Sequence, residues 1–159
     1  MRLRNLSILL ALSTAACTSP SAQKQAVEQG ARCPEVGFIK GYQTTPENGD
    51  FDFALANFDG GCLFEDGKVI VETKLKVVAR AKEADEDGAY PKRVEVPYFA
   101  AIVNPSEDGI TRQDYIARVP LKFGEGQKIE NLRHTIPRKD VRDAGRYTIS
   151  FGLILPETE

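Results

Sequence analysis

The sequence predicts an all-β protein, an antiparallel β-sandwich of about seven to eight short strands. Three observations predict it. Apolar and polar residues alternate along several short segments, and this period of two is typical of half-buried strands. Turn-forming residues separate these segments at intervals of about ten residues. No segment after residue 32 has the apolar spacing of a helix.

The first two predicted strands are separated by a turn. Residues 36–39 predict a short strand that ends near Gly41, and residues 46–50 have the proline, asparagine and glycine of a turn. In residues 51–55 apolar side chains alternate with small or acidic ones, as expected for a half-buried strand. Phe58 interrupts the alternation, and Gly60-Gly61 predict a bulge or a close approach of two backbones.

A hairpin and the clearest strand follow. Residues 65–68 read Glu-Asp-Gly-Lys, and Asp-Gly readily adopts the positive φ angles of a tight hairpin turn. Every second residue from Val69 to Ala79 is apolar except Thr73, while the opposite face includes a glutamate and two lysines. One buried face and one solvated face are typical of antiparallel sheets.

Four segments complete the sandwich. Residues 94–103 are apolar on both faces and predict a central strand, in which Pro97 predicts a bulge or a register change. In residues 115–123 every second residue, up to and including Phe123, is apolar, which predicts a further strand. Residues 129–136 predict a weaker strand and residues 147–155 the last one. A closed barrel is the alternative, and it requires longer strands around a lined cavity.

Asp143-Ala144-Gly145-Arg146-Tyr147 resembles the D-x-G-x-Y tyrosine corner of immunoglobulin-like domains. The resemblance implies an immunoglobulin-like sandwich. Ile149 stands where such a domain has its second cysteine, and the chain has no tryptophan. The resemblance therefore concerns the architecture and leaves the strand order open.

The N-terminal residues 1–16 have the pattern of an export signal. Arg2 and Arg4 precede an apolar run over residues 6–12, and small residues follow. The run is far shorter than the roughly 20 residues that a membrane-spanning helix needs. Thr14-Ala15-Ala16-Cys17 then resembles the lipobox of bacterial lipoproteins, although that family usually has leucine where Thr14 stands.

This resemblance implies that Cys17 is lipidated and becomes the first residue of the mature chain, which the lipid then attaches to a membrane. Thr18, rather than aspartate, follows Cys17, and the sorting rule of many such lipoproteins then implies the outer membrane, with the domain facing the periplasm. The alternative is an ordinary secretory signal and a soluble periplasmic protein. Residues 17–32 are small and polar and predict a lipidated, flexible tether, and residues 33–159 predict one domain.

The cysteine count agrees with lipidation. With Cys17 modified, Cys33 and Cys62 remain and are expected to form a disulfide in an oxidising compartment, the alternative being two buried thiols. Removal of Arg2 and Arg4 leaves 19 basic residues against 23 acidic ones, a net charge of −4. This charge argues against a nucleic-acid partner and against electrostatic binding to anionic lipid.

Few residues carry recognisable chemistry. The only histidine, His134, is expected on the surface, and no nucleophile elbow, zinc-protease or phosphate-loop motif is present. Glu83, Asp85 and Asp87 imitate the first ligands of a calcium loop, but Val94 stands where that loop needs its bidentate glutamate. We therefore expect a solvated acidic loop, with these three residues as a weak metal candidate, and no cofactor.

The overall layout resembles small bacterial envelope lipoproteins with a single β-sandwich. The resemblance implies a non-enzymatic, lipid-anchored module that binds an unknown envelope protein. The alternative is a periplasmic carrier of a small ligand or lipid with a barrel-like fold, and a carboxylate-based hydrolase is a third hypothesis. A filled core with an exposed apolar edge favours the interaction module, whereas an apolar cavity favours the carrier.

Overall fold

The computed structural model describes residues 30–45, 49–65, 67–104, 109–137 and 141–155. These residues form seven strands and one 3-10 helix, η1, at Val141–Arg146. The strands are β1 Glu35–Phe38, β2 Phe51–Glu65, β3 Lys68–Ala81, β4 Arg93–Asn104, β5 Gly109–Pro120, β6 Glu125–Pro137 and β7 Thr148–Leu153.

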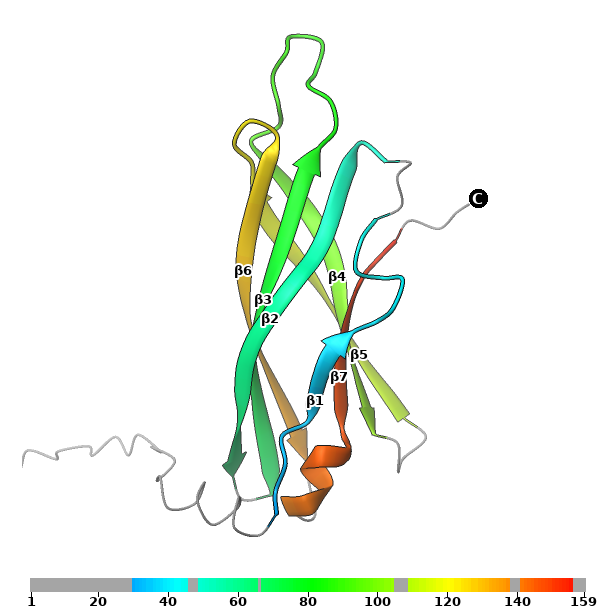
Figure 1. The fold of residues 1–159 in the computed structure, drawn as a ribbon, viewed down its shortest axis with the longest axis vertical. Helices are drawn as coiled ribbons and strands as arrows, with labels where there is room; N and C mark the ends of the chain where they lie inside the picture. Colours follow the sequence, from blue (N-terminus) through cyan, green and yellow to red (C-terminus); the bar gives the residue numbers. More distant parts are fainter. Residues whose placement is uncertain (1–29, 46–48, 66, 105–108, 138–140, 156–159) are drawn as a thin grey trace, which may run out of the picture.

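The strands form two sheets that face each other (Figure 1). One sheet has four strands in the order β1-β7-β4-β5, and the other has three in the order β2-β3-β6. All neighbouring strands are antiparallel except β1 and β7, which run parallel. The predicted all-β sandwich of about seven strands is therefore confirmed.

The strand order differs from that of immunoglobulin domains. Those domains place the first, second, fifth and fourth strands in one sheet and the third, sixth and seventh in the other. Here the third strand pairs with the second and the sixth, while the seventh pairs with the first and the fourth. The resemblance at the tyrosine corner holds locally: Tyr147 Oη donates a hydrogen bond to the Pro137 carbonyl oxygen at 3.3 Å and accepts one from Asn104 Nδ2 at 3.1 Å.

The interior lies between β3 and the middle strands of the larger sheet. The inner face of β3, at alternate residues from Val69 to Ala79, is buried. Side chains of β4 and β7 cover it, among them Tyr98, Ile149 and Phe151. Full burial of such an aliphatic or aromatic side chain contributes about 1.5–3 kcal/mol. As predicted, β4 is central, between β7 and β5.

Pro97 causes neither a bulge nor a register change between β4 and β5, so that expectation is wrong. The pairs run without interruption from Arg93 with Pro120 to Asn104 with Gly109. The Pro97 carbonyl oxygen accepts a hydrogen bond from the Ile154 amide at 3.1 Å, just beyond the end of β7. Since N–H and C=O of a strand residue point the same way, the missing N–H lies on the side where β7 ends, and the ladder between β4 and β5 does not need it.

The two irregularities predicted in β2 are both present. Its register against β3 shifts between Leu55 and Phe58. Gly60, which pairs with Thr73, lies so close to β3 that an added Cβ would collide with the backbone oxygen of Glu72. Gly61, the next residue, has open space around its Cα. The pair therefore includes one close backbone approach, at Gly60.

The connection between β1 and β2 joins the two sheets along one side. The Ile39 amide donates to the Phe151 carbonyl oxygen at 2.9 Å, and the Tyr42 carbonyl oxygen accepts from the Leu153 amide at 2.7 Å. Two residues later the chain has changed sheets, because Thr44 forms a bridge with Ala54 of β2. These bonds close the sandwich between the β1–β7 border and β2.

The contrast between the two glycines gives a direct test of the close approach. Gly60→Ala should cost about 1–3 kcal/mol of unfolding free energy, because the backbone of β3 must move to admit the methyl group. Gly61→Ala is the matched control and should change it by less than about 0.5 kcal/mol. Urea unfolding followed by circular dichroism measures both. Equal effects of the two substitutions would contradict the close approach at Gly60.

Candidate functional site

The predicted lipid-attachment residue Cys17 lies outside the described residues. In the described part of the chain, no helix is long and apolar enough to cross a membrane.

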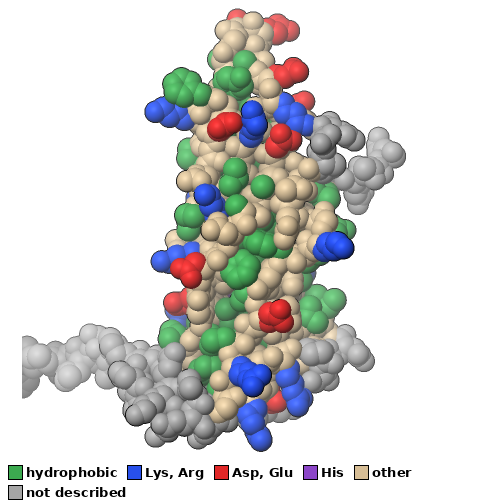
Figure 2. Space-filling view, in the orientation of Figure 1, with side chains coloured by type: hydrophobic (Ala, Val, Ile, Leu, Met, Phe, Trp, Pro, Cys, Tyr) green, Lys and Arg blue, Asp and Glu red, His purple; other side chains and the backbone are tan. Residues whose placement is uncertain are grey.

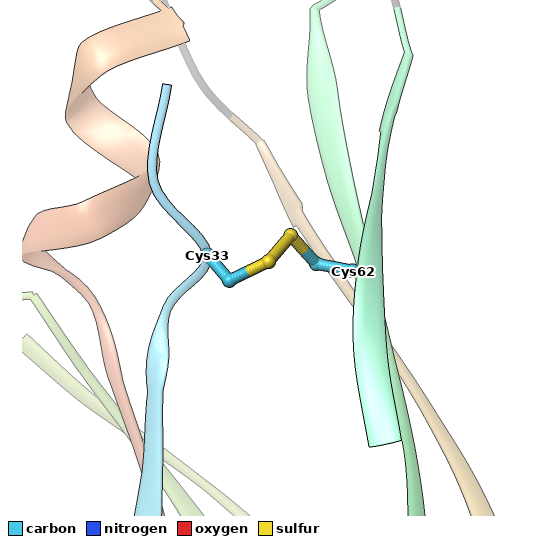
Figure 3. Close-up of a disulfide and its surroundings, with 2 residues drawn as sticks. All are labelled: Cys33 and Cys62. Carbon is cyan, nitrogen blue, oxygen red and sulfur yellow. A yellow bond between two sulfur atoms is a disulfide. The ribbon is translucent and has the colours of Figure 1, made fainter. Parts of the chain in front are cut away.

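Cys33 and Cys62 form a disulfide with a Cα–Cα distance of 5.7 Å, as the cysteine count predicts (Figure 3). Cys33 lies two residues before β1 of the larger sheet begins, and Cys62 lies in β2 of the smaller one. The bond therefore links the two sheets on the side that the β1–β2 connection also closes. For a separation of 29 residues, restriction of the unfolded chain contributes about 3–4 kcal/mol.

The weak metal candidate, residues Glu83, Asp85 and Asp87, lies in a turn in which Asp85 bonds backbone groups of the same turn. Asp85 Oδ1 accepts hydrogen bonds from the backbone amides of Asp87, at 3.1 Å, and Ala89, at 2.7 Å. The Asp85 amide also donates to the Ala89 carbonyl oxygen at 2.8 Å. Among the described residues, Glu83, Asp85 and Asp87 included, no group of three or more histidine, cysteine or acidic side chains is arranged to hold a metal ion.

His134 is buried rather than on the surface, so the expectation from the sequence is wrong. Only 1% of the residue is exposed. On β6 it occupies the same face as Leu132 and Ile136, which are also buried. The alternation of these three residues is the signal by which the sequence places His134 in the interior, since every second residue of a strand shares a face.

Aromatic and polar side chains from both sheets surround His134. Its ring centroid lies 6.4 Å from that of Tyr115 and 6.1 Å from that of Phe151. Tyr115 in turn stacks on Tyr98 at 5.2 Å. Within the described residues, both nitrogens of His134, Tyr98 Oη and Thr73 Oγ1 are buried without a hydrogen-bond partner. We call His134, Tyr98, Tyr115 and Thr73 the interior polar cluster.

Burial sets the protonation of this cluster. It lowers the pKa of His134, because the charged imidazolium loses its hydration. It raises the pKa of Tyr115 and Tyr98, and for Tyr98 the nearby charge of Glu130 adds to the rise. Glu130 itself pairs with Lys128, with 2.6 Å between Oε1 and Nζ. The cluster is therefore neutral near pH 7.

The geometry of the cluster is not that of a nucleophile and its base. A general base must reach the group that it deprotonates within about 3.2 Å. Neither nitrogen of His134 hydrogen-bonds a described residue, and the Tyr115 hydroxyl donates instead to Gln113 Oε1 at 2.7 Å. The cluster is a set of buried polar side chains in an apolar core, and its protonation makes the stability of the fold depend on pH.

A groove of about 430 Å³ lies on the smaller sheet where the glycine pair leaves β2 without side chains. It crosses three neighbouring rows of residues in β2, β3 and β6. Four charged residues contribute to its lining, Asp59, Glu72, Lys74 and Arg133, of which Glu72 and Arg133 form a loose ion pair at 4.0 Å. The groove is an open hollow on the outer face of the sheet with charged residues in its lining, whereas the carrier hypothesis needs an apolar cavity that encloses its ligand.

Several of the large exposed apolar side chains lie along β5, β6 and the turn between them. They are Ile110, Ile116, Phe123 and Ile129, with exposures of 71, 60, 85 and 50%. We call these four residues the β5–β6 apolar set. The alternation predicts a strand up to Phe123, but β5 ends at Pro120 and the turn places Phe123 outside, at a φ of 53°.

Basic and acidic side chains are interspersed along the face seen in Figure 2. Several are paired across strands, such as Arg118 with Glu95 at 3.0 Å and Arg80 with Glu125 at 3.2 Å. Such exposed pairs add little stability.

Comparison of this chain with protein-family models, with curated proteins and with solved structures gives no match. The functional argument therefore rests on the residues and their geometry.

The buried histidine makes a pH-dependent prediction. The unfolded chain binds a proton on His134 with a pKa near 6.5, whereas the native state resists this protonation because burial lowers that pKa. Unfolding therefore takes up a proton at acidic pH, and stability falls as the pH drops from about 6.5 towards 5. His134→Phe, which suits the neighbouring Tyr115 and Phe151 rings, should remove this dependence. Urea midpoints between pH 8 and pH 5 measure it, and parallel curves for the two proteins would refute the assignment.

Proposed function

We propose that this protein is a non-enzymatic, lipid-anchored protein of the bacterial cell envelope, whose β-sandwich faces the periplasm and binds another protein. The observation that carries the proposal is the combination of an apolar core packed between the two sheets with the exposed β5–β6 apolar set. Exposed apolar side chains along one side of a molecule are a feature of protein interaction surfaces.

The interior supports an interaction module over a ligand carrier. Inward side chains of both sheets form one contiguous core, in which Tyr98, Phe151 and Leu153 have exposures of 1% or less. A carrier of lipid or of another apolar ligand needs an apolar cavity of some 300–1,000 Å³. The groove on the smaller sheet reaches that size but is lined by charged residues on an outer surface.

The N-terminal sequence supports the anchor. A lipid on Cys17 holds the chain on a membrane by burial of its acyl chains, at about 0.8 kcal/mol per methylene, and no protein segment has to cross the bilayer. The polar residues 18–32 then separate the lipid from the disulfide at Cys33. With Thr18 after the cysteine, we place the protein in the outer membrane.

Cys17→Ala tests the anchor. The full chain should move from the membrane fraction to the soluble fraction, because the lipid-bearing sulfur is lost. Thr18→Ala is the matched control and should stay with the membrane. Fractionation of envelopes after a high-salt wash, followed by immunoblotting, measures the distribution. If the Cys17→Ala chain stays in the membrane as the wild type does, the lipoprotein assignment is wrong.

Photoreactive residues test the interaction surface. A photoreactive side chain at Phe123 or Ile129 should give covalent adducts with an envelope protein when intact cells are irradiated, because both positions are exposed and apolar. The same residue at Glu95, on the outer side of the other sheet's central strand, is the control and should give fewer adducts. Adducts at the control position alone, or at none of the three, would reject this surface as the docking site.

A further inference from the structure

β5 has an unpaired edge. It is the border strand of the four-stranded sheet and pairs only with β4 (Figure 1). Twelve consecutive pairs join the two strands without a register shift, so the edge is regular over its whole length. The backbone N–H and C=O groups on the other side of β5 can therefore accept a further strand.

The other three border strands are protected in ways that β5 is not. β1 has only four residues, β2 has a register shift and a bridge to Thr44, and β6 directs Lys128 and Glu130 inward. Short length, irregularity and inward charge are the usual devices that prevent edge pairing. In β5, residues Gly109–Asp114 are instead exposed on both faces.

The sequence of this edge is complementary to itself. Residues 110–116 read Ile-Thr-Arg-Gln-Asp-Tyr-Ile. In an antiparallel pair of two such strands centred on Gln113, Ile110 lies opposite Ile116 of the second copy, and Arg112 lies opposite its Asp114. Thr111 then faces Tyr115, and Gln113 faces Gln113. Apolar, charged and polar residues therefore all meet suitable partners in one register.

We propose that β5 pairs antiparallel with β5 of a second copy of this chain, with the two-fold axis at Gln113. The two four-stranded sheets then become one continuous sheet of eight strands. This inference rests on the proposed function in one respect, because it names a second copy of the chain as one partner of the interaction module. The pairing itself does not require the lipid on Cys17.

The exposed side chains support this occupant. Ile110 and Ile116, at 71 and 60% exposure, cover each other across the axis. Arg112 and Asp114 already pair within the strand at 2.6 Å, with about half of each side chain exposed, and the second copy extends this pair to four alternating charges. Both residues lie on the outward face, where Arg112 also stacks over Phe99 at 4.3 Å.

Charge also selects the register. In the alternative registers that keep the same faces together, each residue meets a partner two positions away, and the axis moves by one residue. A shift in one direction places Arg112 opposite Arg112, and a shift in the other places Asp114 opposite Asp114. Like charges directly opposite destabilise a strand pair, so the register centred on Gln113 is favoured over its neighbours.

Charge reversal tests the pairing with full-length chains that carry two different affinity tags and are expressed together. Arg112→Asp makes both charged positions acidic, and Asp114→Arg makes both basic. Each variant alone should show about tenfold less recovery of one tagged copy with the other, because two charge pairs per dimer become repulsive. Co-expression of Arg112→Asp with Asp114→Arg should restore recovery to the wild-type level, since opposite charges meet again.

This restoration separates pairing from misfolding, because two misfolded variants would not rescue each other. The double substitution in one chain, Arg112→Asp with Asp114→Arg, should also recover self-association. If single variants associate as the wild type does, or if the mixed pair stays apart, the β5 pairing is overturned.

A cysteine at the axis tests the geometry. Directly opposite residues of antiparallel strands have Cβ atoms about 4.5–5.5 Å apart, close enough for a disulfide after small adjustments. Gln113→Cys should give a covalent dimer on a non-reducing gel of intact cells, whereas Gln127→Cys, on the exposed outer face of β6, should give at least about tenfold less.

Equal cross-linking at both positions, or none at residue 113, would refute the dimer. Neither result would affect the membrane retention that depends on Cys17 or the photo-adducts at Phe123 and Ile129. The dimer and the proposed function can therefore fail separately.

Discussion

Burial of one continuous apolar face on β3 is the constraint on which the rest of the structure depends. The inner side chains from Val69 to Ala79 are almost fully buried, although β3 belongs to a sheet of only three strands. Such a face needs a second layer about 10 Å away. β4 and β7 supply that layer, and the chain therefore changes sheets between β3 and β4 rather than adding β4 beside β3.

This crossing leaves the two open sides of the sandwich in different states. On one side, the disulfide between Cys33 and Cys62 and the hydrogen bonds of residues 39–45 connect the sheets. On the other side, β5 and β6 are bridged at their turn by Lys122 and Glu125, and they carry the β5–β6 apolar set. A stiff, closed side and an open side with exposed apolar side chains suit a module that presents one surface to partners.

The interior polar cluster makes the stability of the fold depend on pH. A buried imidazole is stable only when neutral, because an unpaired charge between two apolar sheets loses most of its hydration. His134 meets the aromatic rings of Tyr115 and Phe151, and within the described residues neither of its nitrogens bonds an acidic side chain that would favour its charged form. Acidification therefore weakens the sandwich from within, before most carboxylates titrate.

Local patterns in the sequence determined most of the strands, the hairpin at residues 65–68, an irregularity at Gly60-Gly61 and the cysteine pair. Alternation and turn chemistry act over short distances, and the cysteine count leaves one pair once Cys17 is set aside. The pattern placed the fifth strand at residues 115–123, whereas β5 runs from Gly109 to Pro120. Tertiary structure alone decided that β7 pairs with β1 and β4, that Pro97 faces the end of β7, and that Phe123 lies outside. These outcomes depend on which segments meet in space, and the strand period of two says only that a face is buried, not what covers it. The open edge of β5 was also decided by the tertiary structure. The sequence does not show which strands lie at the border of a sheet, and in the fold β5 is such a border strand, paired with β4.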